Sequence, residues 1–189
     1  MAANMSEHET RQALTNLFAN KKEDILVDQM KNDTISIRDG ARDVNVVISD
    51  CENLEVEVPD KVKSVRILQS KHIKLKISAI IVGALEIVSS NAITVEVNHE
   101  HIPTYLLDMT CDVTLNIRGD SAQPVWRIYT ANSMRTFVNC KPTTEADRET
   151  FEIPRDAISK AGRRFKTWRC DGQFKHNECD IDYGDLLQG

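Results

Sequence analysis

Residues 54–77, LEVEVPDKVKSVRILQSKHIKLKI, decide the fold. Within them, LEVEV (54–58), SVRIL (64–68) and IKLKI (73–77) each alternate apolar with polar side chains. Side chains of a β-strand point alternately to the two faces of a sheet, so this alternation is typical of strands with one buried face. The polar turn QSKH (69–72) separates the last two segments. The stretch therefore predicts a strand, a turn and a strand as one structural unit.

The same unit recurs along the middle of the chain. Its second strand begins at residues 54, 73, 93, 113 and 134, a spacing of 19 to 21 residues: LEVEV (54–58), IKLKI (73–77), ITVEV (93–97), VTLNI (113–117) and MRTFV (134–138). A first strand precedes each: VNVVI (44–48), SVRIL (64–68), ALEIV (84–88), TYLLD (104–108) and VWRIY (125–129). One unit cannot bury its apolar face alone, whereas stacked units share a continuous core. We therefore predict an all-β, right-handed parallel β-helix of about six coils of roughly 20 residues each. A sandwich or barrel is the alternative, because short strands also recur there.

Charged residues at equivalent outward positions predict the register of the coils. Glu57, Lys76 and Glu96 follow one another in successive units, and Arg66 precedes Glu86 in the same way. Neighbouring coils would place these side chains about 4.8 Å apart with alternating sign, which avoids repulsion.

Both ends of the chain depart from the repeat. Ser6 and Glu9 fit a capping box, and apolar residues follow at helical spacing, which predicts a helix over residues 6–20. We assign residues 1–32 to this helix and a linker, and residues 33–189 to the β-helix domain. The helix either packs on the end of the domain or binds a partner.

The C-terminal end is predicted to be a hairpin over about residues 163–183, with a tight turn at Asp171-Gly172. The segment before it, KPTTEADRETFEIPRD (141–156), reads as a loop. An isolated hairpin is marginally stable in water, so the open end of the β-helix or a second subunit must cover this one.

Composition excludes several classes of function. The chain has 189 residues, of which 41% are hydrophobic and 28% are charged. Its net charge is −5, and a negatively charged protein is a poor match for the phosphates of a nucleic acid. No apolar run approaches the ~18 residues of a membrane span. The polar start predicts no leader, and five cysteines at irregular spacing suggest reduced thiols in a cytoplasmic protein. No nucleophile–base pair, phosphate-binding loop or paired acids stand out, so we expect neither an enzyme nor a cofactor.

Three runs of the sequence resemble the C-terminal β-helical domain of adenylyl cyclase-associated proteins. They are VNVVISDCENLEVEVPDKVKSVRILQSKHIKLKI (44–77), SSNAITVEVNHEHIPTYLLD (89–108) and IYTANSMRTFVNCKPTTEADRETFEIP (128–154), and the final FKTWRCDGQFKHNECDID (165–182) resembles the terminal hairpin of the family. The resemblance implies a cytoplasmic, cytoskeleton-associated protein that binds monomeric actin, prefers its ADP form and promotes exchange of its nucleotide. It also implies a homodimer that exchanges the terminal hairpin.

Several residues are candidates for contacts with actin. Lys71, Lys74 and Lys76 form a basic stripe that would suit the acidic surface of actin, although pairing with glutamates of neighbouring coils is the alternative. The remaining candidates lie in a polar turn and near the C-terminus: Asn98, His101, Asp180 and Asp182.

The hairpin supplies the candidate residues of the dimer interface: Phe165, Trp168, Phe174 and Ile181. Phe165 and Trp168 fall on opposite faces of one strand, which suits a strand covered on both sides; the alternative is one buried face and one exposed aromatic ring. Cys170 lies near Gln173 across the turn and away from Cys179, so we predict no metal site with His176.

A second function comes from a relative of the fold, the tubulin-folding cofactor C domain. That domain activates a GTPase through an outward arginine. Arg66 and Arg127 occupy predicted outward positions and are the candidates for this role.

Overall fold

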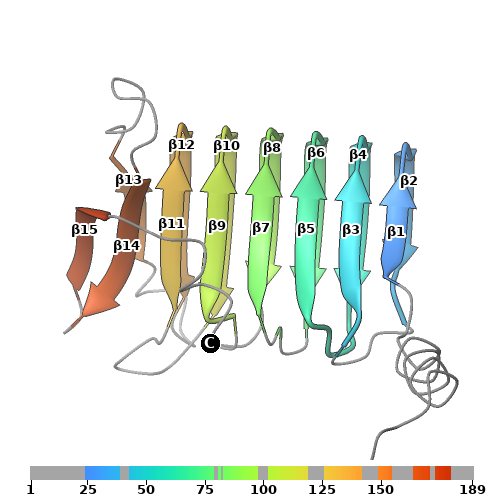
Figure 1. Cartoon of the computed structure of the whole chain (residues 1–189), viewed down its shortest axis with the longest axis horizontal. Helices are drawn as coiled ribbons and strands as arrows, with labels where there is room; N and C mark the ends of the chain where they lie inside the picture. Colours follow the sequence, from blue (N-terminus) through green and yellow to red (C-terminus); the bar gives the residue numbers. More distant parts are fainter. Residues whose placement is uncertain are drawn as a thin grey trace, which may run out of the picture.

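The computed structural model describes residues 24–38, 43–78, 81, 83–97, 102–118, 126–141, 149–154, 164–170 and 173–179, and these form two facing β-sheets (Figure 1). Sheet A has eight strands, in the order β1 (Ile25–Asp28), β3 (Asn45–Ser49), β5 (Ser64–Leu68), β7 (Ala84–Val88), β9 (Thr104–Asp108), β11 (Arg127–Ala131), β14 (Arg164–Cys170) and β15 (Gln173–Cys179). Sheet B has seven strands, in the order β13 (Glu149–Ile153), β12 (Met134–Lys141), β10 (Cys111–Arg118), β8 (Asn91–Val97), β6 (Lys71–Ile77), β4 (Glu52–Val58) and β2 (Lys31–Ser36).

The chain alternates between the sheets, so that each coil contributes one strand to each. Strands β1 to β12 form six such pairs, and neighbouring strands of each sheet run parallel from the first coil to the last. The result is a parallel β-solenoid. The predicted all-β parallel β-helix is therefore confirmed, and three of its predicted strands, at 64–68, 84–88 and 104–108, have the predicted bounds.

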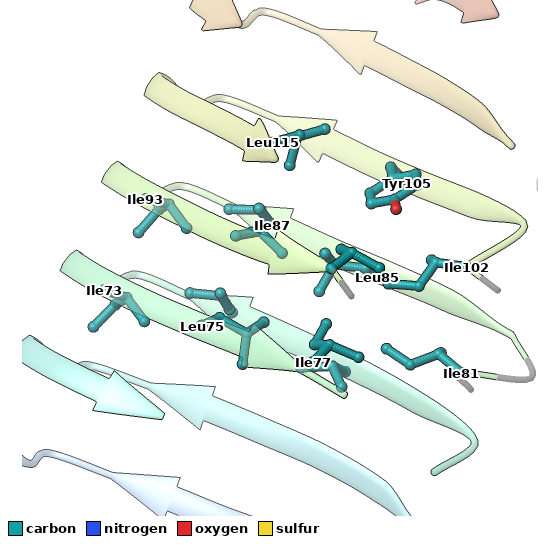
Figure 2. Close-up of a cluster of buried hydrophobic side chains, with 14 of the residues drawn as sticks. Ile73, Leu75, Ile77, Ile81, Leu85, Ile87, Ile93, Ile102, Tyr105 and Leu115 are labelled. Atoms are coloured by element: carbon teal, nitrogen blue, oxygen red, sulfur yellow. The ribbon is translucent and has the colours of Figure 1, made fainter. Parts of the chain in front are cut away.

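The core lies between the two sheets and follows the predicted alternation. Every predicted inward side chain of the repeat is buried, including Leu75 and Leu85, whose exposed fractions are both 0%. Figure 2 shows how side chains of successive coils stack on one another inside the solenoid. Each coil thus covers the apolar side chains of the next, as the repeat predicted.

The turns between paired strands are alike in every coil. Each holds two residues with positive φ, three positions apart: Gln29 and Asn32, Asp50 and Asn53, Gln69 and His72, Ser89 and Ala92, Met109 and Asp112, and Asn132 and Arg135. Asn and Asp tolerate this left-handed conformation better than most residues, which explains why they are frequent here.

A small polar side chain lies buried inside most of these turns. The Ser70 hydroxyl accepts a hydrogen bond from the Cys51 amide at 3.1 Å, and the Ser90 hydroxyl accepts one from the Ser70 amide at 3.1 Å. Ser70 and Ser90 also donate to the carbonyl oxygens two residues earlier, at 2.7 and 2.8 Å. The hydroxyl ladder satisfies backbone groups that a buried turn would otherwise leave without partners.

The C-terminal end is closed by antiparallel strands. β14 pairs with β11 in sheet A and with β15 across the hairpin, which confirms the predicted hairpin. The ring of Phe174 on β15 stacks on Phe151 with 4.4 Å between centroids, and lies 6.1 Å from the ring of Trp126. The hairpin thus covers the open end of the solenoid within the same chain.

One predicted loop contains a strand. We expected residues 141–156 to form a loop, but β13 pairs antiparallel with β12. Its inward residues include Ile153, which is 5% exposed. This strand was missed because it is short, follows a polar and charged stretch, and has no partner at the period of the repeat.

The solenoid begins earlier than the boundary that we placed at residue 33. Ile25–Asp28 and Lys31–Ser36 already pair with the second coil. The helix predicted over residues 6–20 lies outside the described residues.

Candidate functional site

The outer face of sheet B is a ladder of paired charges. Lys74 lies between two acids, with its Nζ 4.0 Å from Glu55 Oε1 and 3.7 Å from Glu96 Oε1. Lys76 donates to Glu55 Oε1 as well, diagonally across the strands. The hydrogen bond from Lys76, and the charges of Lys74 and Lys76, hold the pKa of Glu55 below its ordinary value.

The predicted basic stripe is therefore largely neutralised by its own neighbours. Lys74 and Lys76 each face a carboxylate of an adjacent coil, and this pairing is the alternative to an actin-facing role. Lys71 is exposed and lies opposite Glu52 and Asn91 in the register of the sheet. Exposed ion pairs contribute little to stability, so the ladder mainly reflects the register of the coils.

Five of the predicted site residues lie outside the described part of the chain: Asn98, His101, Asp180 and Asp182 of the predicted actin contacts, and Ile181 of the predicted dimer interface.

A polar cleft lies at the edge of the first coils, where the turns between paired strands meet sheet B. It is open to solvent, has a volume of about 480 Å3, and is lined by Asn32, Asp33, Thr34, Asn53, Leu54, Glu55 and His72. Asn53 donates to Asn32 Oδ1 at 3.0 Å, and its own Oδ1 lies 3.0 Å from His72 Nδ1. These side chains therefore satisfy one another along the corner of the solenoid.

The outer face of sheet A has a different composition. Leu68, Val88, Leu106 and Tyr129 point outward from it and are half-buried, and Met109, in a turn at its edge, is 55% exposed. An ion pair on this face joins Arg66 Nε to Glu86 Oε2 at 3.1 Å.

The hairpin extends this face at the C-terminal end. Trp168 lies opposite Arg127 and Lys175, and Lys166 lies opposite Tyr129. The Nζ of Lys166 lies 5.1 Å from the centroid of the Trp168 ring, within the range of a cation–π interaction. Phe165 points to the opposite side and is 8% exposed, so the predicted division of the two aromatic rings between the faces is confirmed.

Burial holds two weak acids inside the C-terminal coils, the Tyr105 phenol and the Cys140 thiol, in their neutral forms. Burial raises the pKa of the Tyr105 phenol well above its ordinary value. Burial also raises the pKa of the Cys140 thiol to about 11. Arg169 and Glu149 form an ion pair at 2.8 Å where the end of the solenoid is closed. These groups belong to the packing of the end.

The cysteines of the hairpin are separated as predicted. Cys170 lies opposite Gln173, and Cys179 lies opposite Arg164 at the other end of the two strands. Among the described residues, no three histidine, cysteine or acidic side chains come together as a metal site would require. In the same part of the chain, no helix is long and apolar enough to cross a membrane.

The two candidate arginines differ in their surroundings. Both are exposed, as predicted for outward positions. Arg66 is held by Glu86, whereas Arg127 forms no ion pair with the residues that the structure describes. Arg127, Lys166 and Lys175 were not among the residues that we predicted to contact actin. Their proximity depends on the antiparallel docking of β14 on β11, which the repeat does not encode.

Comparison with known proteins places this geometry in a family. In a solved structure described as the crystal structure of cyclase-associated protein from Cryptosporidium parvum, a chain is similar in fold, with a TM-score of 0.62 and 20% sequence identity. The match covers 82% of this chain and 88% of that one. No curated protein sequence matches the chain. The family model for the C-terminal domain of adenylate cyclase-associated (CAP) proteins matches residues 15–167, most of the solenoid. The chain therefore belongs to the CAP C-terminal domain family.

Proposed function

We propose that this protein binds monomeric actin, prefers its ADP form and promotes exchange of the bound nucleotide, acting in the cytoplasm on the cytoskeleton. The observation that carries the proposal is the family match over residues 15–167, which spans the coils together with β13 and part of β14. The similar fold of a solved cyclase-associated protein supports it.

The proposed activity needs no covalent chemistry. Exchange is accelerated if the protein binds an open conformation of actin more tightly than a closed one, because the ligand then shifts the population towards the open state. A rigid surface is suited to this role, since a surface that deformed with its partner would not discriminate between two conformations. The solenoid provides one, because its strands are joined coil to coil in continuous register.

A homodimer formed through the C-terminal hairpin is part of the proposal. The hairpin is joined to the solenoid by the pairing of β14 with β11 and by the rings of Phe151, Phe174 and Trp126. A partner's hairpin could make the same contacts, so that exchange would preserve the packing. Phe165 and Phe174 would then lie at the interface.

The test is the rate at which fluorescent ATP replaces ADP on actin monomers, with and without this protein, together with its mass by light scattering. Faster exchange by a species of twice the mass of one chain supports the proposal. Unchanged exchange and no actin complex would contradict it. GTPase activation of tubulin and small G proteins, measured with Arg66 and Arg127 substituted, would then test the alternative function.

A further inference from the structure

A group of outward side chains at the C-terminal end of sheet A forms a continuous surface from β9 to β15. Tyr129 lies opposite Leu106 on one side and Lys166 on the other. Two residues further along the same strands, Trp168 lies between Arg127 and Lys175. We call these six residues the basic-aromatic patch: Leu106, Arg127, Tyr129, Lys166, Trp168 and Lys175.

The patch has the composition of a protein-binding surface. Leu106, Tyr129 and Trp168 are half-buried, and Arg127 and Lys175 are exposed. Trp, Tyr and Arg are the residues most often found to dominate the binding energy of protein interfaces, because they combine a large apolar area with a polar group. The strands beneath the patch are held in the sheet, so its shape is fixed before a partner arrives.

The charge of the patch is positive, although the chain carries a net charge of −5. Within the described part of the chain, Arg127, Lys166 and Lys175 form no ion pair, and Lys166 instead lies over the ring of Trp168. The neighbouring Glu86 is already paired with Arg66, and Asp108 is half-buried at the end of β9. These cations are thus available for an acidic partner in a way that Lys74 and Lys76 of sheet B are not.

We infer that the basic-aromatic patch is the surface through which this protein binds its acidic protein partner, which is monomeric actin under the proposed function on which this inference rests. The partner's carboxylates pair with Arg127 and Lys175, and an apolar side chain packs on Tyr129 and Trp168. The charge ladder of sheet B stays outside the interface, because breaking its internal pairs would remove as much electrostatic energy as a new contact would supply.

Single charge reversals on the two faces test the inference. Arg127→Glu and Lys175→Glu change the patch, and Lys71→Glu makes the same change of charge at an exposed lysine of sheet B. Binding of each full-length variant to fluorescently labelled ADP-actin is measured at low and high salt. All three positions are exposed, so thermal unfolding should remain at the wild-type temperature and serves as the folding control.

We expect Arg127→Glu to weaken binding about tenfold and Lys175→Glu about threefold, with Lys71→Glu within about twofold of wild type. The wild-type affinity should also fall more steeply with salt than that of Arg127→Glu, because screening then has fewer charge pairs to weaken. If the wild-type protein binds actin and both patch variants bind it as tightly as wild type, the inference about the binding surface is wrong and the proposed function stands. If wild type binds no actin, the proposed function fails, and this inference fails with it.

Discussion

On their inner sides, sheets A and B bury the same kinds of side chain; on their outer sides, they present different chemistry. The outer face of sheet B pairs its charges coil by coil, as Lys74 does with Glu55 and Glu96. The outer face of sheet A carries half-buried apolar and aromatic residues and ends in cations without a paired acid in the described residues. The stacked coils need apolar side chains only on the inner faces of the two sheets. The side chains of the outer faces can therefore differ and serve binding.

The largest expected effect is a loss of stability when a buried leucine is truncated on the inner face of either sheet. Leu75 of sheet B and Leu85 of sheet A are both 0% exposed. Leu75→Ala and Leu85→Ala should therefore each lower the free energy of unfolding by about 2–5 kcal/mol, through lost burial and the cavity left behind. Chemical denaturation of the two variants measures this. A loss below about 1 kcal/mol for only one of them would break the equivalence of the two inner faces.

Loss of the ring of Phe174 should have a smaller effect, at the C-terminal end where β15 of sheet A packs against β13 of sheet B. Phe174→Ala removes the stacking on Phe151 at 4.4 Å and the contact with Trp126. We expect the free energy of unfolding to fall by about 1–3 kcal/mol, because the ring is only partly buried. Lys175→Ala, an exposed neighbour on the same strand, is the control and should change it by less than about 0.5 kcal/mol. Equal stabilities of the two variants would mean that the hairpin does not cap the solenoid.

Two cysteines of sheet B, one inward and one outward, should differ in their reactivity. Cys140 lies inside with its pKa raised to about 11, whereas Cys111 lies half-buried on the outer side. At pH 8 about one Cys140 thiol in a thousand would be the reactive thiolate, so alkylation should modify Cys111 much faster. Mass spectrometry of peptides after a short exposure to iodoacetamide measures this ratio. Faster modification of Cys140 would contradict its inward position.

The smallest effect is the shifted pKa of Glu55 on the outer face of sheet B. Its pKa is lowered, chiefly by the hydrogen bond from Lys76. A lowered pKa in the folded state means that the pairing favours folding above the unfolded pKa and is lost as the pH falls through the folded one. Lys76→Met should raise the pKa of Glu55 towards its ordinary value, and NMR titration of the carboxyl group measures it. An unchanged pKa would show that the ladder is not formed in solution.

The interior of the repeat could be predicted from the sequence because its signal is periodic. Apolar residues such as Leu75 and Leu85 recur at every second position within strands and at every coil between them, so register and burial follow together. The ladder of opposite charges was predicted for the same reason. The actual pairs are partly diagonal, as between Lys76 and Glu55, because long side chains choose among several neighbours after the backbone is fixed.

The C-terminal end could be predicted only in part, because it is not periodic. The hairpin was visible from its turn, but β13 was read as a loop. The meeting of Arg127 with Trp168 depends on β14 returning antiparallel to β11 after a gap of more than thirty residues. No local pattern encodes such a long-range pairing, so the basic-aromatic patch could not be found before the structure.

The most direct test of the difference between the two outer faces is lysine labelling of the wild-type protein, with and without saturating ADP-actin, read by mass spectrometry. The method compares both faces in one sample and needs no substitution. Binding through the basic-aromatic patch predicts that labelling of Lys166 and Lys175 falls in the complex, while labelling of Lys71 stays the same. Protection of Lys71 with Lys166 and Lys175 still labelled would place the partner on sheet B and contradict the account.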